Sequence, residues 1–217
     1  MQMPEPHGAA LRVGYVPGVT LTKWRTIWAE RFPRQRLDVV EIDQDDQRRA
    51  LTAAEVDLCF VRLPINTDQL HLIQLYEELP VAWAAKDHLI AAADQITLAD
   101  LATETVVTTL TPFHIDLVTA GEAVLLVPQS VARTHSRRDL IYRVITDAPS
   151  TTVGLAWLKD NPQELIDEFI GVVRGRTANS ARSAQERAAK GRPAKPAKAK
   201  AAPKPSAKPS PRRRGRR

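Results

Sequence analysis

The chain contains no Leu, Ile, Val, Met, Phe, Tyr or Trp after Thr177. The last 41 residues consist mainly of Ala, Pro, Lys, Ser and Arg. Such a segment cannot bury enough apolar surface to offset the conformational entropy lost on ordering. We therefore expect residues 177–217 to form a disordered tail and residues 1–10 a disordered N-terminus. The folded part should come from residues 11–176.

The predicted tail and the predicted folded body carry opposite charges. The tail has 14 basic residues and one acidic residue, Glu186, which gives it a net charge of +13. The body has 17 basic and 24 acidic residues, which gives it a net charge of −7. The pI of about 9.7 therefore describes the tail rather than the body.

The tail predicts contact with a polyanion, because each phosphate that it neutralises would release counterions. Its Lys190-Gly191-Arg192-Pro193 segment resembles the core of an AT-hook, in which Arg enters a narrow minor groove. The Ala-, Lys- and Pro-rich run resembles the tails of linker histones. A solubilising tail without a defined target is the alternative. The candidate DNA-binding residues are Lys190, Gly191, Arg192, Pro193, Arg212, Arg213, Arg214, Arg216 and Arg217.

Strand and helix patterns alternate along the body. The segments 11–16, 37–42 and 57–61 read as strands with helical periodicity between them, which is typical of an α/β fold with a parallel sheet. The third segment is almost continuously apolar, as expected for a strand buried on both faces. Further strands are expected at 81–85, 105–109, 123–127, 140–145 and 153–157.

Several helix ends have sequence signals. Thr20 or Thr22 is expected to cap the first helix. Asp45 and Asp46 should open the second helix, with Leu51 and Ala54 facing inward. A last helix should be capped by Asn161, with Pro162 in its first turn and Glu164 completing a capping box.

Composition and motifs argue against several classes of protein. A single cysteine, Cys59, cannot form an internal disulfide and favours a reducing, cytoplasmic compartment. We find no apolar run of membrane-spanning length, no phosphate loop, no metal-ligand spacing and no Gly-x-Ser-x-Gly elbow. The five histidines are scattered. The sequence therefore predicts no catalytic site, no metal and no cofactor.

Five segments together resemble the substrate-binding domain of LysR-type transcriptional regulators. They are LRVGYVPGVT, AAEVDLCFVRLPI, LPVAWAAKDHLIA, LVTAGEAVLLVPQSVA and TDAPSTTVGLAWLKDN, in the order of the family. The resemblance covers about residues 11–180. It implies a periplasmic-binding-protein type II-like α/β effector domain of two lobes. Two departures are that no winged helix-turn-helix pattern precedes Leu11 and that the second lobe looks shortened between Thr111 and Asp116.

In this family the two lobes clamp a small effector, often an organic anion. The loop before the first helix offers backbone N–H groups to a carboxylate. Arg62 follows a buried strand, where ligands of open α/β sheets lie. Alternatively, Thr20 is only a cap, Arg62 pairs with a carboxylate such as Asp68, and Gln129 faces solvent. The candidate effector-binding residues are Val19, Thr20, Arg62, Leu63 and Gln129.

The resemblance and the tail together predict the effector module of a cytoplasmic, nucleoid-associated transcriptional regulator. It would sense a small ligand, form homodimers or heterodimers with related regulators, and contact AT-rich or non-specific DNA through its tail. The alternative is a sensor that pairs with regulators and does not bind DNA itself.

Overall fold

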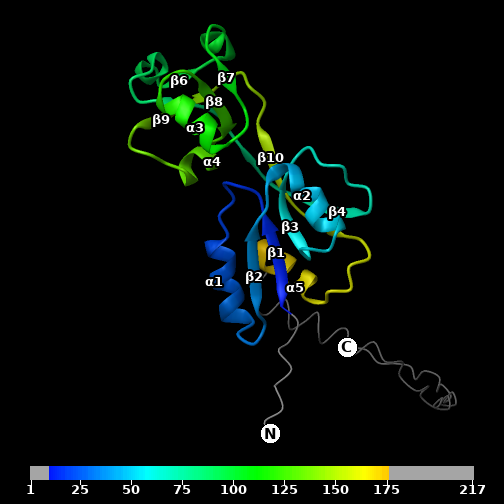
Figure 1. The fold of residues 1–217 in the computed structure, drawn as a ribbon. Helices are drawn as coiled ribbons and strands as arrows, with labels where there is room; N and C mark the ends of the chain where they lie inside the picture. The colour runs from blue at the N-terminus through cyan, green and yellow to red at the C-terminus, as the bar shows by residue number, and fades with distance from the viewer. Residues whose placement is uncertain (1–9, 176–217) are drawn as a thin grey trace, which may run out of the picture.

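The computed structural model describes residues 10–175, which form two lobes (Figure 1). The N-terminal elements, the last strand and the last helix build lobe 1, and lobe 2 is inserted between them. The described chain passes between the lobes after Glu78 and again over residues 146–150. The predicted two-lobed α/β fold is confirmed.

Lobe 1 contains a five-stranded sheet with the order β2-β1-β3-β10-β4. Strand β1 runs parallel to β2 and β3, as the alternation of strands and helices predicts. Strand β10 runs antiparallel to β3 and β4. The strands are β1 (Leu11–Tyr15), β2 (Leu37–Glu41), β3 (Leu58–Arg62), β4 (Leu70–Glu78) and β10 (Thr151–Leu158).

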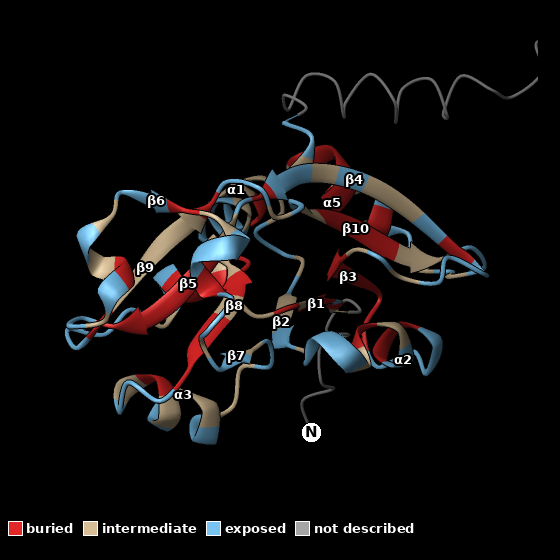
Figure 2. Ribbon diagram, turned by 90° about the horizontal axis from the view of Figure 1, so that it is seen from above, coloured by how far each residue is buried: buried red, intermediate tan, exposed pale blue. Residues whose placement is uncertain are grey.

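Helices cover both faces of this sheet, and β3 shows why. Every residue of β3 is buried (Figure 2). Successive side chains of a strand point to opposite faces of the sheet. Leu58 and Phe60 share a core with α1 and α5, whereas Cys59 and Val61 share another with α2. Trp24 stacks on Phe60 with ring centroids 4.6 Å apart. The helical segments are α1 (Thr22–Arg31), η1 (Gln44–Asp46), α2 (Gln47–Thr52) and α5 (Leu165–Val173).

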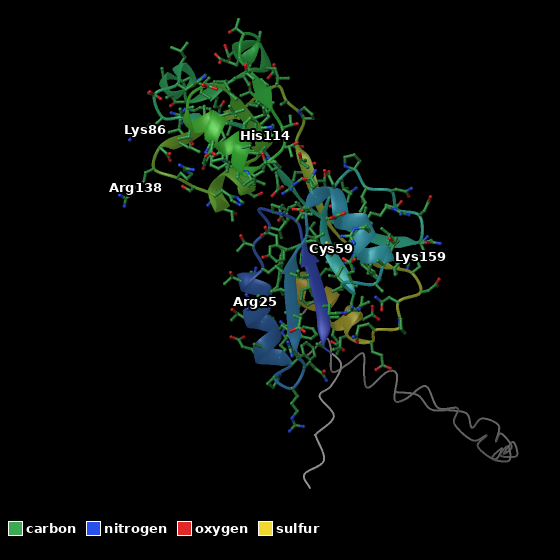
Figure 3. The ribbon with its side chains drawn as sticks, in the orientation of Figure 1. Arg25, Cys59, Lys86, His114, Arg138 and Lys159 are labelled. Carbon is green, nitrogen blue, oxygen red and sulfur yellow. The ribbon has the colours of Figure 1, made fainter. Side chains whose placement is uncertain are left out.

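Cys59 lies inside lobe 1 (Figure 3). It has no exposed surface, and burial raises the pKa of its thiol to about 12. Because the thiolate is the reactive form, Cys59 is an inert core residue.

Lobe 2 contains a second five-stranded sheet with the order β6-β9-β5-β8-β7. Val81 and Trp83 of the central strand pack with α3 and α4, and Ala82 and Ala84 pack with η2 and η3. The strands are β5 (Pro80–Ala85), β6 (Gln95–Ile96), β7 (Val106–Val107), β8 (Val124–Pro128) and β9 (Leu140–Ile145). The helical segments are η2 (Leu89–Ala92), η3 (Leu98–Leu101), α3 (Pro112–Thr119) and α4 (Gln129–Thr134). The segment predicted to be shortened forms α3, and the lobe keeps a five-stranded sheet.

Strand β4 is absent from the sequence prediction. It lies at the edge of the sheet, and its residues are mostly half-buried or exposed. Polar residues such as His71 and Gln74 therefore interrupt its apolar pattern, and no continuous run marks the strand.

Two predicted helix starts are wrong. Helix α1 begins at Thr22 after Leu21, and no side chain caps it. Helix α5 begins at Leu165, and Asn161 lies in the turn before it, where its side-chain oxygen accepts a hydrogen bond from the Gln163 N–H at 3.0 Å. The polar side chain stabilises a local turn instead of the helix end, which is the competing use of Asn near helices.

The interior of the second helix is only partly as predicted. Leu51 is fully buried in α2. Ala54 is exposed in the following turn, with a φ of 53°. The helix therefore ends before Ala54 can face inward.

Within residues 10–175, none of the helices is long and apolar enough to cross a bilayer.

Candidate functional site

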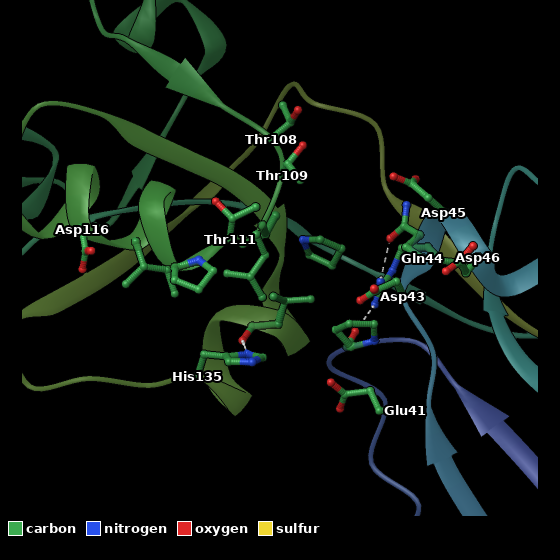
Figure 4. A pocket seen from close by; sticks show the side chains of 18 of the residues that line it. Glu41, Asp43, Gln44, Asp45, Asp46, Thr108, Thr109, Thr111, Asp116 and His135 are labelled. Atoms are coloured by element: carbon green, nitrogen blue, oxygen red, sulfur yellow. Dashed lines mark hydrogen bonds between the residues drawn. The ribbon is translucent and has the colours of Figure 1, made fainter.

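A cleft of about 830 Å³ separates the two lobes (Figure 4). We call it the interlobe cleft. The lobe 1 wall consists of Pro17, Glu41, Asp43, Gln44, Asp45, Asp46 and Arg62. The lobe 2 wall consists of Thr108, Thr109, Leu110, Thr111, Pro112, Ile115, Asp116, Val127, Pro128, Val131, His135 and Arg137. Its position at the carboxyl ends of β1, β2 and β3 is where open α/β sheets bind ligands.

Arg62 lies at the end of β3 and is 3% exposed. Its Nη2 donates to Glu78 Oε2 at 2.8 Å and to the Pro17 carbonyl at 3.0 Å. Its Nε donates to the same Glu78 oxygen at 3.0 Å, and its Nη1 donates to Gln44 Oε1 at 3.0 Å. The guanidinium is therefore held within lobe 1 by an internal carboxylate. Arg62 lies at the cleft, as predicted. The alternative prediction that Arg62 pairs with Asp68 is wrong, because Asp68 is exposed and Arg62 pairs with Glu78.

A side-chain amide fixes the backbone at the same residue. Gln47 is 6% exposed, and its Nε2 donates to the Arg62 carbonyl while its Oε1 accepts from the Arg62 N–H, both at 2.9 Å. Helix α2 thus clamps the end of β3. The Arg62 side chain starts from a fixed backbone position.

The lobe 1 wall of the cleft is acidic. The chain leaves β2 at Glu41 and enters η1, which brings Asp43, Asp45 and Asp46 to the same end of the sheet. Asp46 accepts from Arg49 Nε at 2.9 Å, and this hydrogen bond lowers the pKa of Asp46. The other three carboxylates take part in none of the ion pairs within residues 10–175.

The lobe 2 wall combines hydroxyls with apolar groups. Thr111 caps α3, because its hydroxyl accepts from the His114 N–H at 3.1 Å. Thr108 and Thr109 carry their hydroxyls toward the acidic wall (Figure 4). Apolar surface comes from residues such as Ile115 and Val131.

Two lobe 2 groups on the wall can carry positive charge, and each has a partner. His135 Nδ1 lies 3.1 Å from the Val131 carbonyl, to which it donates. Arg137 donates to both carboxylate oxygens of Asp139, at 3.1 and 2.8 Å. Asp139 raises the pKa of Arg137, and Arg137 lowers the pKa of Asp139.

The other predicted effector residues do not line the interlobe cleft. Val19 is buried in the lobe 1 core, and Thr20 is exposed and caps nothing. Leu63 is half-buried, and its N–H donates to the Thr152 carbonyl at 2.9 Å. Gln129 begins α4 and is also half-buried, so it neither lines the cleft nor faces solvent freely. Contact between these four residues and an effector stays a prediction.

The lobes touch beside the cleft. Gly18 has a φ of 92°, and a Cβ added there would lie 2.6 Å from Ser130 Oγ and 2.8 Å from the Val131 nitrogen. The loop after β1 therefore packs directly against the start of α4. This close approach involves the residues directly after Gln129, one of the predicted effector-binding residues.

Apart from Arg62, the sequence prediction of effector-binding residues includes none of the residues on the two walls of the cleft. The sequence places Glu41 in the strand 37–42 and gives Asp45 and Asp46 only the start of a helix, although the acidic residues lie at the carboxyl end of a parallel strand. Thr108 and Thr109 are the last two residues of the predicted strand 105–109, although three of the four residues at 108–111 are threonines and Pro112 follows. Position after a strand was the signal in the first case, and a Thr-Pro helix start was the signal in the second.

The predicted DNA-binding residues, from Lys190 to Arg217, lie outside the described residues. Within residues 10–175, no group of three or more His, Cys, Asp or Glu side chains could hold a metal ion.

Comparison with known proteins identifies the family. A family model described as the LysR substrate binding domain matches residues 5–115, which is just over half of the chain. The chain belongs to this family. The LysR substrate-binding domain that the sequence resembles is thereby confirmed.

Individual relatives are distant in sequence and similar in fold. The Hca operon transcriptional activator HcaR of Escherichia coli K12 is 22% identical over 78% of this chain and 68% of its own. The BenM effector binding domain with its effector benzoate is 20% identical, with a TM-score of 0.64 over 79% of this chain and 93% of that one. A mutant OxyR regulatory domain from Pseudomonas aeruginosa is also 20% identical, with a TM-score of 0.62 over 78% and 100%. These structures establish the fold of this LysR substrate-binding domain.

Proposed function

We propose that this LysR substrate-binding domain senses a small molecule in the interlobe cleft and conveys its presence to transcription. The observation that carries the proposal is a cleft of about 830 Å³ whose walls come from two separate lobes. This volume lies in the range of small-molecule pockets, about 300–1,000 Å³. A ligand touching both walls would favour one relative position of the lobes over others, which is the requirement for a ligand-driven switch.

The relatives support a regulatory role. HcaR is a transcriptional activator, and BenM carries an effector in its effector binding domain. The described residues that line the cleft include neither a nucleophile paired with a base nor a cluster of metal ligands. We therefore propose a regulatory rather than an enzymatic protein, acting in the cytoplasm and on the nucleoid.

Ligand screening by thermal denaturation of the full chain tests the sensing proposal. A ligand present at 100 times its Kd should stabilise the chain by about 2.7 kcal/mol. Replacing Thr109 by Trp should remove the stabilisation, since the new ring would fill the cleft. Thr103→Trp, at an exposed lobe 2 position off the cleft, is the matched control and should retain it. Equal ligand stabilisation in both variants would exclude the cleft as the site.

We further propose that residues 177–217 contact DNA through their charge. The +13 net charge supports this, because neutralised phosphates release counterions. If about half of the 14 basic residues meet phosphates, the logarithm of affinity should fall against the logarithm of salt concentration with a slope of about −6. Gel-shift titrations of the full chain at several salt concentrations measure this slope. Replacing all 14 basic residues by Gln should abolish the shift, and an unchanged shift would overturn the assignment.

The oligomeric state is a separate proposal carried by the resemblance. A homodimer, or a heterodimer with a related regulator, would bring two effector domains together. Light scattering of the full chain decides the homodimer, and a strictly monomeric mass would leave only pairing with a second regulator.

A further inference from the structure

The interlobe cleft has an excess of negative charge. Its wall carries five carboxylates, Glu41, Asp43, Asp45, Asp46 and Asp116, against two guanidinium groups, Arg62 and Arg137, and one imidazole, His135. Figure 4 shows Glu41, Asp43 and Asp45 extending from lobe 1 toward lobe 2, whereas Asp46 lies further back beside Arg49. Four of the five carboxylates have no ion-pair partner within residues 10–175.

Both guanidinium groups on the wall are already neutralised. Arg62 is paired with Glu78 at 2.8 Å, and the two side chains are 3% and 4% exposed. Arg137 is paired with Asp139 through two hydrogen bonds. In addition, Glu78 Oε1 is buried without a hydrogen-bond partner among the described residues, so the carboxylate behind Arg62 is not fully compensated. Glu41 accepts a hydrogen bond from Tyr15, and Asp116 lies near Arg137. An incoming carboxylate would meet no unpaired guanidinium, and it would face Asp43 and Asp45, which take part in none of the ion pairs within residues 10–175.

The geometry points to an organic cation, with a primary ammonium or guanidinium group, as the ligand of this cleft. This inference rests on the proposed sensing function and names its ligand class, in contrast to the organic anion implied by the family resemblance and to the benzoate of BenM. The positive group would lie against this wall at Asp43, which has Glu41 on one side and Asp45 on the other (Figure 4). A carboxylate–ammonium hydrogen bond is charge-assisted, so the recognition would be both electrostatic and directional.

The opposite wall defines the rest of the ligand. The hydroxyls of Thr108 and Thr109 face the acidic wall (Figure 4). The apolar side chains of Leu110, Ile115 and Val131 also line the lobe 2 side of the cleft. These groups suit a short hydrocarbon or aromatic portion attached to the cation. A ligand with its charge on the lobe 1 wall and its apolar part on the lobe 2 wall would hold the lobes together.

Calorimetric titration of the full chain with charge-reversed pairs of probes tests the inference. The pairs are 1,4-diaminobutane against hexanedioate, and benzylamine against benzoate. The amines should bind in at least one pair, and more tightly than the matching carboxylate. Raising the salt concentration should weaken amine binding, because the carboxylates of the wall remain accessible to counterions.

A double variant locates the binding. Glu41→Gln with Asp43→Asn should weaken amine binding by about 10-fold or more, since it removes two charges from the wall. Glu30→Gln with Asp160→Asn removes the same charges from exposed positions off the cleft and should leave the affinity within about 2-fold. Circular dichroism of both variants reports whether the fold is kept.

The outcomes separate this inference from the proposed function. Tighter binding of the carboxylates overturns the cation assignment and leaves ligand sensing in place. Amine binding that is unchanged in the Glu41/Asp43 variant also overturns the assignment, because the site would lie elsewhere. Absence of binding by either class, together with no stabilising ligand in the thermal screen, overturns both proposals.

Discussion

The substitution Arg62→Met tests the central ion pair of lobe 1. It removes a guanidinium that donates to Glu78, Gln44 and the Pro17 carbonyl, and it leaves the Glu78 carboxylate buried. The Glu78 side chain is 4% exposed, so water can do little to compensate the lost partner. Breaking a buried pair by removing one partner costs about 3–5 kcal/mol, and we expect this loss in the free energy of unfolding.

An exposed ion pair of the same type provides the control. Arg36 and Asp38 lie 2.6 Å apart, but their side chains are 73% and 42% exposed. Exposed pairs contribute only about 0–1 kcal/mol, so Arg36→Met should cost no more than this. The difference between the two losses in free energy of unfolding reports the effect of burying an ion pair, since both variants break one.

Urea denaturation followed by circular dichroism measures both losses. Adding Glu78→Leu to Arg62→Met should recover part of the stability, because the uncompensated charge is then removed. The reasoning fails if Arg62→Met is as mild as Arg36→Met, or if the double variant is less stable than Arg62→Met alone.

Three further predictions follow from single positions. In urea denaturation, Gly18→Ala should lower the free energy of unfolding more than Gly121→Ala. Both glycines have a positive φ, but only at position 18 would the added Cβ meet another residue, the Val131 nitrogen at 2.8 Å. Equal losses would show that the lobes do not meet there. The Cys59 thiol, whose pKa burial raises to about 12, should react with a disulfide reagent only after unfolding, and rapid labelling of the native chain would contradict its burial. Hydrogen bonds from the Thr97 backbone and hydroxyl lower the pKa of Asp100, so the contribution of Asp100 to stability is present above the ordinary aspartate pKa and is lost as pH falls through the lowered value. Asp100→Asn should therefore reduce the loss of stability below about pH 4. Identical profiles of stability against pH for the two proteins would refute this.

The central strand β3 of lobe 1 was predictable because its residues are almost continuously apolar. The β3 segment is buried on both faces, so every position is apolar up to Arg62, and no other element gives this pattern at that length. The structure has a capping box at Thr97 and Asp100, whose hydrogen-bonding partners lie within one turn of each other. Signals of this kind are local, and the sequence contains them completely.

The cleft was not predictable in the same way. Arg62 was placed correctly by its position after a parallel strand, but its partner Glu78 is 16 residues away at the end of an unpredicted edge strand. The acidic and threonine walls come from segments more than 60 residues apart in the chain, and only the relative position of the lobes brings them together. Charge neutralisation of Arg62 is therefore a tertiary property. The Arg62 guanidinium, which the sequence suggests as a donor to an anionic ligand, is already paired with Glu78 in the folded chain.

The position of the Arg62–Glu78 pair gives it a second consequence. Glu78 is the last residue of β4, directly before the chain passes into lobe 2, and Arg62 also binds the Pro17 carbonyl of the loop that reaches α4. The pair thus joins one connection between the lobes to the loop that touches lobe 2. A cation that binds beside Asp43 and Asp45 would not displace Arg62 from Glu78, because this ion pair is buried and Arg62 has further hydrogen bonds. Ligand binding should therefore change the distance between the two walls of the cleft, while the connection at Glu78 keeps its position in lobe 1.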